Sequence, residues 1–185
     1  MEPEAASVLL ISGSTRAGSS NAAALREVHG LNLPGIRTDL YGSLRDLPAF
    51  VPEELPVPAP VADLLGRIQR ADAVLLCTPE YAGGLPGSLK NLLDWTVAGG
   101  ELYEKPVAWL DVANPGRGQG ARTQLGVVLG YVGAQIVTEA CVHLELERTD
   151  GVASIAAAER PRLIRAVETL AAAGRRTGSP PGADH

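Results

Sequence analysis

Short apolar runs alternate along the chain with stretches in which apolar residues recur at helical spacing. The apolar runs are rich in β-branched residues and predict five strands, at residues 8–12, 36–41, 73–78, 107–112 and 134–146. Three of them, 8–12, 73–78 and 107–112, are apolar almost throughout, as expected of strands that helices cover on both faces. Such alternation is typical of βαβ units, so we predict an α/β fold around a five-stranded parallel sheet, with the more polar 36–41 at an edge.

Five helices are predicted between and after these strands. Two segments place apolar residues at i, i+3, i+4 and i+7, which marks one face of a helix. These residues are Val61, Leu64, Leu65 and Ile68, and then Leu125, Val128, Leu129 and Val132. A third helix is predicted over 21–29, and a fourth from about Leu85 with Pro86 in its first turn. The last helix has Pro161 in its first turn and Gly174 as its C-terminal stop.

The pattern predicts one domain, residues 1–174, followed by a tail, residues 175–185, that we expect to be disordered. The 185 residues are the length of one ordinary domain, and no internal repeat or shift in composition marks a second. Residues 47–60 contain five prolines, which excludes a central strand or a helix interior. This segment is predicted to be an ordered loop after the second strand.

Composition and charge narrow the classes of function. Aromatic residues make up 4% of the chain and the net charge is −5, which argues against binding to nucleic acid or to an anionic membrane. Cys77 and Cys141 lie far apart in apolar runs, and His29 and His143 are isolated, so we expect core thiols and no metal site. The acidic start of the chain lacks the features of a signal peptide, and a cytoplasmic protein is predicted.

The segment between the first strand and the first helix has the composition of an anion-binding loop. Gly13 and Gly18 let the backbone approach a ligand, Arg16 supplies a positive charge, and the helix N-terminus that follows attracts anions. The side-chain donors are Ser14, Thr15, Ser19, Ser20 and Asn21. Ser19 stands where a P-loop has lysine and no GxGxxG is present, so a phosphate monoester of a mononucleotide suits the loop best. The alternative, that these residues only cap a helix, stays open at this point.

Two motifs in order carry a resemblance to a known family. Residues 13–21 match the pattern GSxRxxSxN, and residues 79–95 match PEYxxxxPGxLKNxxDW. Together they resemble the NADPH-dependent FMN reductase family, which includes quinone, azo-dye and chromate reductases, over about residues 7–172. The resemblance implies a flavodoxin-like fold of sheet order 2-1-3-4-5, with FMN at the carboxyl ends of the strands where the order reverses direction.

The resemblance also implies which residues bind the cofactor. The ribityl phosphate of FMN would be held by Ser14, Arg16, Ser19, Ser20 and Asn21. The isoalloxazine would be lined, chiefly through backbone N–H groups, by Pro79, Glu80, Tyr81 and Ala82. The family usually has Asn where this chain has Ala82. Residues 114–124 resemble the family's glycine-rich third loop, with Arg122 and Gln124 in matching places, and contribute Asn114 and Gly116.

The leading hypothesis is an FMN-dependent oxidoreductase that takes hydride from NADPH or NADH and passes electrons to a quinone or a similar small acceptor. A flavin carries this chemistry itself, so no catalytic side chain is predicted. Two alternatives are a flavodoxin-like FMN electron carrier without turnover of its own and a flavin-free phosphate-binding module. The resemblance further implies a homodimer or homotetramer, for which Trp95 is a candidate interface anchor.

Overall fold

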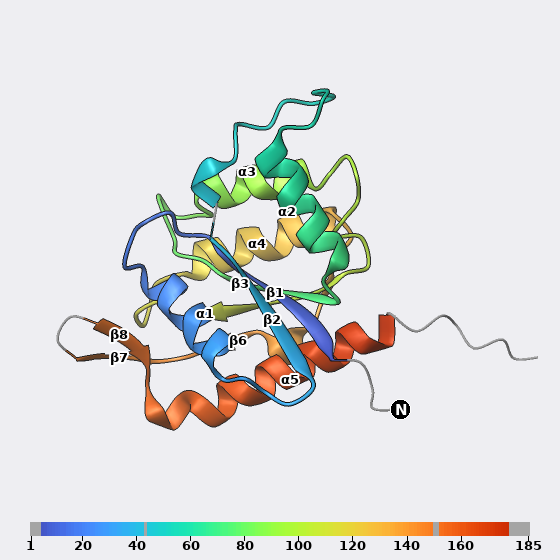
Figure 1. Ribbon diagram of the computed structural model, residues 1–185. Coiled ribbons are helices and arrows are strands. Elements are labelled where there is room, and N and C mark those ends of the chain that lie inside the picture. The colour runs from blue at the N-terminus through green and yellow to red at the C-terminus, as the bar shows by residue number, and fades with distance from the viewer. Residues whose placement is uncertain (1–4, 43, 150–151, 178–185) are drawn as a thin grey trace, which may run out of the picture.

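A parallel sheet forms the centre of the computed structural model, which describes residues 5–42, 44–149 and 152–177. Its main strands are β1 (Ala6–Ser12), β2 (Ile36–Tyr41), β3 (Ala73–Cys77) and β4 (Pro106–Asp111). With β5 (Gln135–Ile136) the order is β2-β1-β3-β4-β5, and each of these pairings is parallel (Figure 1). The predicted α/β fold and sheet order are confirmed, and the more polar β2 lies at an edge as predicted.

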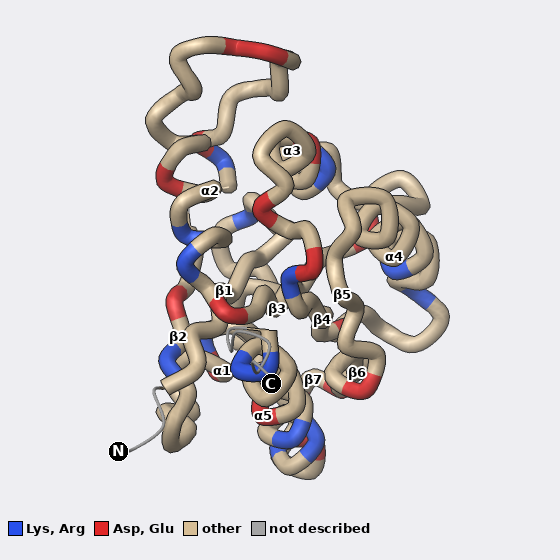
Figure 2. The backbone as a smooth tube through the Cα atoms, turned by 90° about the vertical axis from the view of Figure 1, so that its right-hand side faces the viewer, with Lys and Arg blue, Asp and Glu red and all other residues tan. Residues whose placement is uncertain are grey.

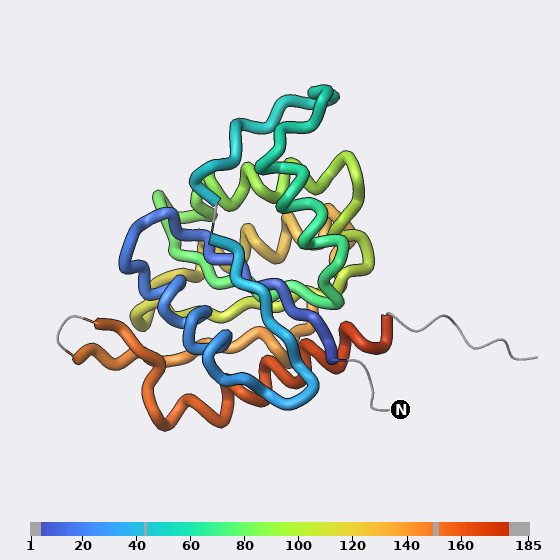
Figure 3. Tube along the Cα trace, viewed as in Figure 1, coloured from blue at the N-terminus to red at the C-terminus, as the bar shows by residue number. Residues whose placement is uncertain are grey.

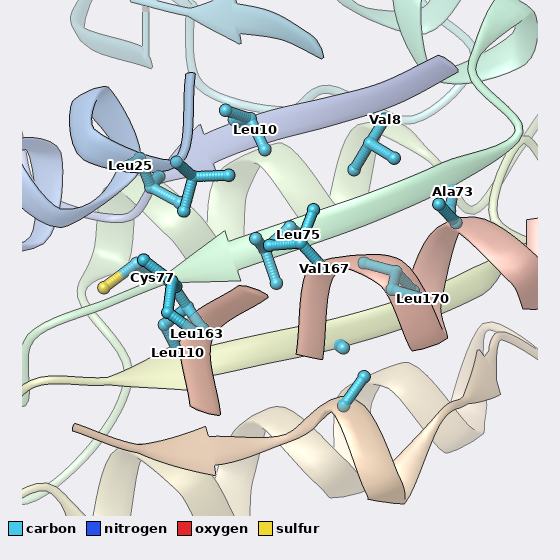
Figure 4. Close-up of a cluster of buried hydrophobic side chains, with 14 of the residues drawn as sticks. Val8, Leu10, Leu25, Ala73, Leu75, Cys77, Leu110, Leu163, Val167 and Leu170 are labelled. Atoms are coloured by element: carbon cyan, nitrogen blue, oxygen red, sulfur yellow. The ribbon is translucent and has the colours of Figure 1, made fainter. Parts of the chain in front are cut away.

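On one face of the sheet, α1 (Ser20–Gly30) and α5 (Arg160–Thr177) pack against alternate residues of the central strands. Figure 4 shows Leu75 of β3 on this face, among apolar side chains that come from both helices. Successive side chains of a strand point to opposite faces, so the neighbouring Leu76 belongs to the other apolar layer. The apolar runs of the sequence are continuous because their alternate residues are buried on opposite faces of the sheet.

The opposite face carries α2 (Ala59–Arg70), α3 (Gly87–Trp95) and α4 (Gln119–Tyr131). The apolar faces predicted for α2 and α4 are confirmed. Their fully buried residues are Val61, Leu64, Ile68, Leu125 and Leu129. The start predicted for α3 is slightly early, because Pro86 is the residue that precedes the helix rather than a residue of its first turn.

The proline-rich segment before α2 is held by α3. It follows a short turn of 3₁₀ helix, η1 (Leu44–Asp46). The carbonyl oxygen of Pro48 accepts hydrogen bonds from Nδ2 of Asn91 at 2.8 Å and from Nε1 of Trp95 at 3.1 Å. The ring of Phe50 meets Trp95 edge-on, with 5.0 Å between ring centroids. Trp95 is only 5% exposed, so the prediction that it anchors a subunit interface is wrong: its ring is covered by this chain's own loop.

The fifth predicted strand, residues 134–146, is wrong as a single element. β5 (Gln135–Ile136) pairs with the start of β4, η2 (Thr138–Ala140) interrupts, and β6 (Val142–His143) pairs with the end of β4. In an unbroken strand, side chains three residues apart point to opposite faces of the sheet. In this segment, however, the side chains of Val137, Ala140 and Leu144 are all buried in the layer between the sheet and α1 and α5. Their spacing of three and then four residues therefore requires the interruption by η2.

An antiparallel hairpin that the strand pattern does not predict follows β6. Its strands are β7 (Leu146–Thr149) and β8 (Val152–Ile155), and it lies beside α1 (Figure 3). The backbone N–H of Ile155 donates to Oε1 of Glu27 on α1 at 2.8 Å. A short η3 (Ala157–Glu159) then leads into α5. The hairpin thus extends the α1 side of the molecule.

The last helix does not stop at Gly174, contrary to prediction. α5 continues to Thr177, so residues 175–177 are helical and not part of a tail, while residues 178–185 lie outside the described residues. A Cβ on Gly174 would lie 2.8 Å from the carbonyl oxygen of Asp72, just before β3. Gly174 is therefore explained by the close approach of α5 to the sheet.

Charged residues of both signs are interspersed over helices and loops, as Figure 2 shows, in a chain whose net charge is −5. Among the described residues, no helix is long and apolar enough to span a membrane. The same residues contain no group of three or more His, Cys, Asp and Glu side chains placed to hold a metal ion.

Two helical glycines provide a test of the close packing of α5. We expect Gly174→Ala to lower the free energy of unfolding, because the added Cβ meets the Asp72 backbone. Gly126→Ala in α4, where a Cβ would meet nothing within 4 Å, should raise it by about 0.5–1 kcal/mol through helix propensity alone. Urea unfolding followed by circular dichroism measures both, and a stabilised Gly174→Ala variant would contradict the explanation.

Candidate functional site

Three loops leave the carboxyl ends of adjacent parallel strands and meet at one edge of the sheet. Loop 1 (residues 13–19) follows β1, loop 2 (residues 78–86) follows β3, and loop 3 (residues 112–118) follows β4. All eleven residues predicted to bind the cofactor lie in these loops or at the first two positions of α1. The topology therefore brings the predicted set to a single edge, at the point where the strand order reverses.

Loop 1 is shaped by its own hydroxyl groups. Oγ of Ser12 accepts a hydrogen bond from the backbone N–H of Ser14 at 3.2 Å, and Oγ of Ser14 accepts from the N–H of Arg16 at 3.3 Å. Ser19 is the N-cap of α1, and its Oγ accepts from the N–H of Asn21 at 3.2 Å. Loop 1 consequently delivers the N-terminus of α1, the positive end of the helix dipole, to the edge of the sheet.

Ser19 and Asn21 are buried and tie loop 1 to the core. Oδ1 of Asn21 lies 3.3 Å from Sγ of Cys77, at the end of β3. Burial raises the pKa of the Cys77 thiol, and it raises that of the half-buried Cys141 to about 11. Both cysteines are therefore neutral packing groups at physiological pH, as predicted.

A cavity of about 520 Å³, here named the central cavity, opens between the three loops. Its lining combines polar groups with an apolar wall. Of the predicted residues it contains Ser20, Asn21, Pro79, Glu80 and Asn114. The apolar part of its wall comes from Val112, Ala113 and Leu146.

The remaining predicted residues lie around the central cavity rather than in its wall. Ser14 and Arg16 line a second cavity of about 350 Å³ on the β2 side of loop 1. There the guanidinium of Arg45 donates to the carbonyl oxygen of Thr15. Gly116 lines a third cavity of about 450 Å³, next to β6.

Loop 2 contains a tight turn whose two central residues, Ala82 and Gly83, have positive φ angles of 49° and 76°. The backbones of Tyr81 and Gly84 exchange two hydrogen bonds of 3.0 Å across it. Positive φ at both central positions is the geometry of a type I′ turn, in which Asn-Gly is preferred. Ala82 is the unusual residue here, because a Cβ disfavours this conformation. The side chain of Tyr81 is about half exposed beside the turn.

Loop 2 is held against the first two turns of α4. Oε2 of Glu80 accepts from the backbone N–H of Ala121 at 3.2 Å, and Oε1 of Gln124 accepts from the N–H of Leu85 at 2.8 Å. Gly120 packs against the carbonyl group of Gly83 so closely that a Cβ would clash. The carboxylate of Glu80 is thus directed to the N-terminus of α4, where the helix dipole favours a negative charge.

Loop 3 is held by a buried carboxylate at the end of β4. Oδ1 of Asp111 accepts from the backbone N–H of Ala113 at 2.9 Å, and Oδ2 forms an ion pair with Nη1 of Arg122. Nδ1 of His143 on β6 lies 3.0 Å from the same oxygen. Asp111 is 5% exposed, so these contacts supply the partners that a buried charge requires.

Several cavity residues are missed by the motif patterns, most clearly Leu146 and Arg148 of β7. Both are contributed by the hairpin that the strand pattern does not predict. The signal that could have found it is Asp150-Gly151, a dipeptide typical of two-residue hairpin turns, between the short strand-like segments 146–149 and 152–155.

Comparison with known proteins identifies the family. The model of the family described as NADPH-dependent FMN reductase matches residues 6–148, which is more than three quarters of the chain. The chain belongs to this family. The predicted family is therefore confirmed, and the matched region contains all three loops.

Several proteins similar to this chain have names that describe reductases or oxidoreductases. An NAD(P)H-dependent FMN reductase of Pseudomonas aeruginosa is 40% identical over 121 residues, which are 63% of this chain and 64% of that protein, or slightly under two thirds of its length. A quinone reductase of Escherichia coli is 32% identical over 139 residues, 71% of this chain and 73% of that protein. The flavoenzyme FerB of Paracoccus denitrificans, an NAD(P)H:(acceptor) oxidoreductase, superposes with a TM-score of 0.73 at 25% identity and covers 92% of this chain and 98% of its own.

The residues of this family member fit an FMN molecule. Loop 1 offers hydroxyl groups, an arginine and a helix N-terminus, which together suit a dianionic phosphate. The central cavity offers an apolar wall for a flat ring and polar groups at its margin. Loop 2 and loop 3 are fixed by Glu80, Gln124 and Asp111, so their backbone groups are preorganised.

The turn of loop 2 allows a direct test. We expect Ala82→Asn to raise the free energy of unfolding by roughly 0.5–1 kcal/mol, because Asn tolerates positive φ better than Ala. Ala82→Val is the matched control and should lower it, since a β-branched side chain tolerates this conformation least. Thermal and urea unfolding measure the series, and equal stability of the three proteins would show that the turn is not strained.

Proposed function

We propose that this chain is an FMN-dependent NAD(P)H oxidoreductase that passes electrons from a nicotinamide donor to a quinone or a similar small acceptor. The observation that carries the proposal is the meeting of loop 1, with its arginine and helix N-terminus, and a partly apolar cavity at one edge of the sheet. The names of the similar proteins from Pseudomonas aeruginosa and Escherichia coli support the same activity. Residues 5–177 would form a single FMN-binding domain.

In this proposal each loop has a distinct task. The phosphate is bound by Ser14, Arg16, Ser19, Ser20 and Asn21. Ser19 and Asn21 also hold loop 1 and the start of α1 in place. The backbone of residues 79–82 lines one side of the ring, and Asn114 and Gly116 approach from loop 3. Arg16 is exposed on its loop and can make charge-assisted, two-pronged hydrogen bonds to phosphate oxygens.

When bound, FMN supplies hydride acceptance and electron transfer. The protein therefore needs only to bind the flavin, orient it and leave one face of its ring accessible. The N–H of Ala121 at the positive end of α4 binds the carboxylate of Glu80 and reduces its repulsion of an anionic ligand. The exposed side chain of Tyr81 forms a border of the open face. No side chain is assigned to proton transfer, and the choice between NADPH and NADH is left to measurement.

Arg16→Ala tests the phosphate assignment. We expect the dissociation constant of FMN to rise roughly 10–100-fold, the effect of losing a hydrogen bond to a charged group, while that of riboflavin, which lacks the phosphate, stays nearly unchanged. Quenching of flavin fluorescence measures both. The control is Arg37→Ala, near the start of β2 and far from the three loops. It also removes one positive charge and should change neither dissociation constant.

Turnover separates the proposed enzyme from an electron carrier. The FMN-loaded protein should bleach on anaerobic addition of NADPH or NADH and regain its absorbance when a soluble quinone is added. A protein that binds FMN but is not reduced by either donor would instead be a flavodoxin-like carrier. Failure to bind FMN at all would favour the flavin-free phosphate-binding module.

We further propose that the protein forms a homodimer or homotetramer through α4. Val127 and Tyr131, one helical turn apart, are 69% and 85% exposed, and the exposed Tyr103 lies beside Gly133 just after this helix. Tyr131→Glu should shift the protein to monomers in light scattering, because it places a charge in an apolar contact. Tyr131→Phe should retain the assembly, and monomeric wild-type protein would reject the proposal.

A further inference from the structure

The β7–β8 hairpin forms one wall of the central cavity. Its base is anchored on α1 by the hydrogen bond from Ile155 to Glu27 and by the buried side chain of Ile155. Leu146, at the start of β7, packs partly against the core and also lines the cavity. Since side chains two residues apart share a face of a strand, Arg148 points to the same side as Leu146. Arg148 accordingly lines the central cavity as well.

The guanidinium of Arg148 reaches the start of α1. Its Nη2 donates to Oγ of Ser20 at 3.3 Å, across 128 residues of sequence. Ser20 is the first residue of α1, where backbone N–H groups have no partner within the helix. A guanidinium carries five N–H donors, and this contact uses one of them. A hydroxyl group, a helix N-terminus and an arginine thus converge on one side of loop 1.

This arrangement brings positive charge together beside the central cavity. The N-terminus of a helix is the positive end of its dipole and disfavours a cation. Arg16 adds a second positive charge on loop 1 itself, where it lines the cavity on the β2 side. The carboxylate of Glu80, on the same cavity wall, is directed instead to the N–H of Ala121. A bound anion would neutralise the charges that these elements bring together.

We propose that Arg148 is a second phosphate-binding arginine, which holds the phosphate monoester of the flavin together with loop 1. The inference rests on the proposed FMN-dependent function. The flavin is favoured over the nicotinamide donor as the source of the phosphate, because the hydrogen-bond partner of Arg148 is Ser20 at the start of α1, within the phosphate motif. The hairpin is then a part of the cofactor site that the loop motifs do not encode.

The test compares FMN with riboflavin on the full chain stripped of flavin. For Arg148→Ala we expect the dissociation constant of FMN to rise about tenfold, the effect of one exposed charge-assisted hydrogen bond, and that of riboflavin to stay unchanged. Arg148→Lys should recover part of the loss, since it keeps the charge and loses the fork geometry. Arg165→Ala, on the exposed face of α5, is the control for loss of one positive charge.

A double variant makes the readout specific. Combining Arg148→Ala with Arg16→Ala should lower the preference for FMN over riboflavin further than either substitution alone, while circular dichroism confirms that each variant is folded. Equal weakening of FMN and riboflavin would overturn the inference, because it would indicate a wall contact or a misplaced hairpin. Unchanged FMN affinity with a raised KM for NADPH would overturn it in favour of the donor's phosphate. If wild-type protein binds no FMN, the proposed function itself fails, which is a separate result.

Discussion

The site depends on one constraint of topology: β1, β3 and β4 are adjacent and parallel, so the loops that follow them must meet at the same edge. Two interior glycines let helices pack closely at the two ends of the strands. Gly174 brings α5 against the start of β3, and Gly120 brings α4 against loop 2. The positions of the loops are therefore set by packing of the whole domain and not by the loops alone.

At this edge of the sheet, individual charges are balanced by neighbouring groups, although the chain is acidic overall. Two carboxylates near loops 2 and 3 have structural partners: Glu80 has the N–H of Ala121, and Asp111 has Arg122 and the N–H of Ala113. Arg16 and Arg148 belong to different elements and flank the start of α1. A net charge of −5 repels extended polyanions, yet a single phosphate can be held by this small set of fixed donors.

Sequence patterns predict what is governed by local periodicity. The strands β1, β3 and β4 and the apolar stripes of α2 and α4 follow from residue spacing, and the loops at their ends follow from topology. The segment from 134 to 144 could not be predicted in the same way, because its buried residues, such as Val137 and Ala140, are placed by contacts with α5 rather than by a repeat. Gly174 is misread for the same reason, since its role depends on the distant Asp72.

The same distinction applies to the site. The motifs of loops 1 and 2 are contiguous in sequence, so they can be recognised without a structure, whereas the contact of Arg148 with Ser20 joins residues 128 positions apart. A ligand phosphate between α1 and β7 would bind only where both elements are folded, and its binding free energy would then stabilise the hairpin together with loop 1. Because β7 and β8 form a short two-stranded ribbon, which has little stability of its own, such a contact would help to hold the ribbon against α1.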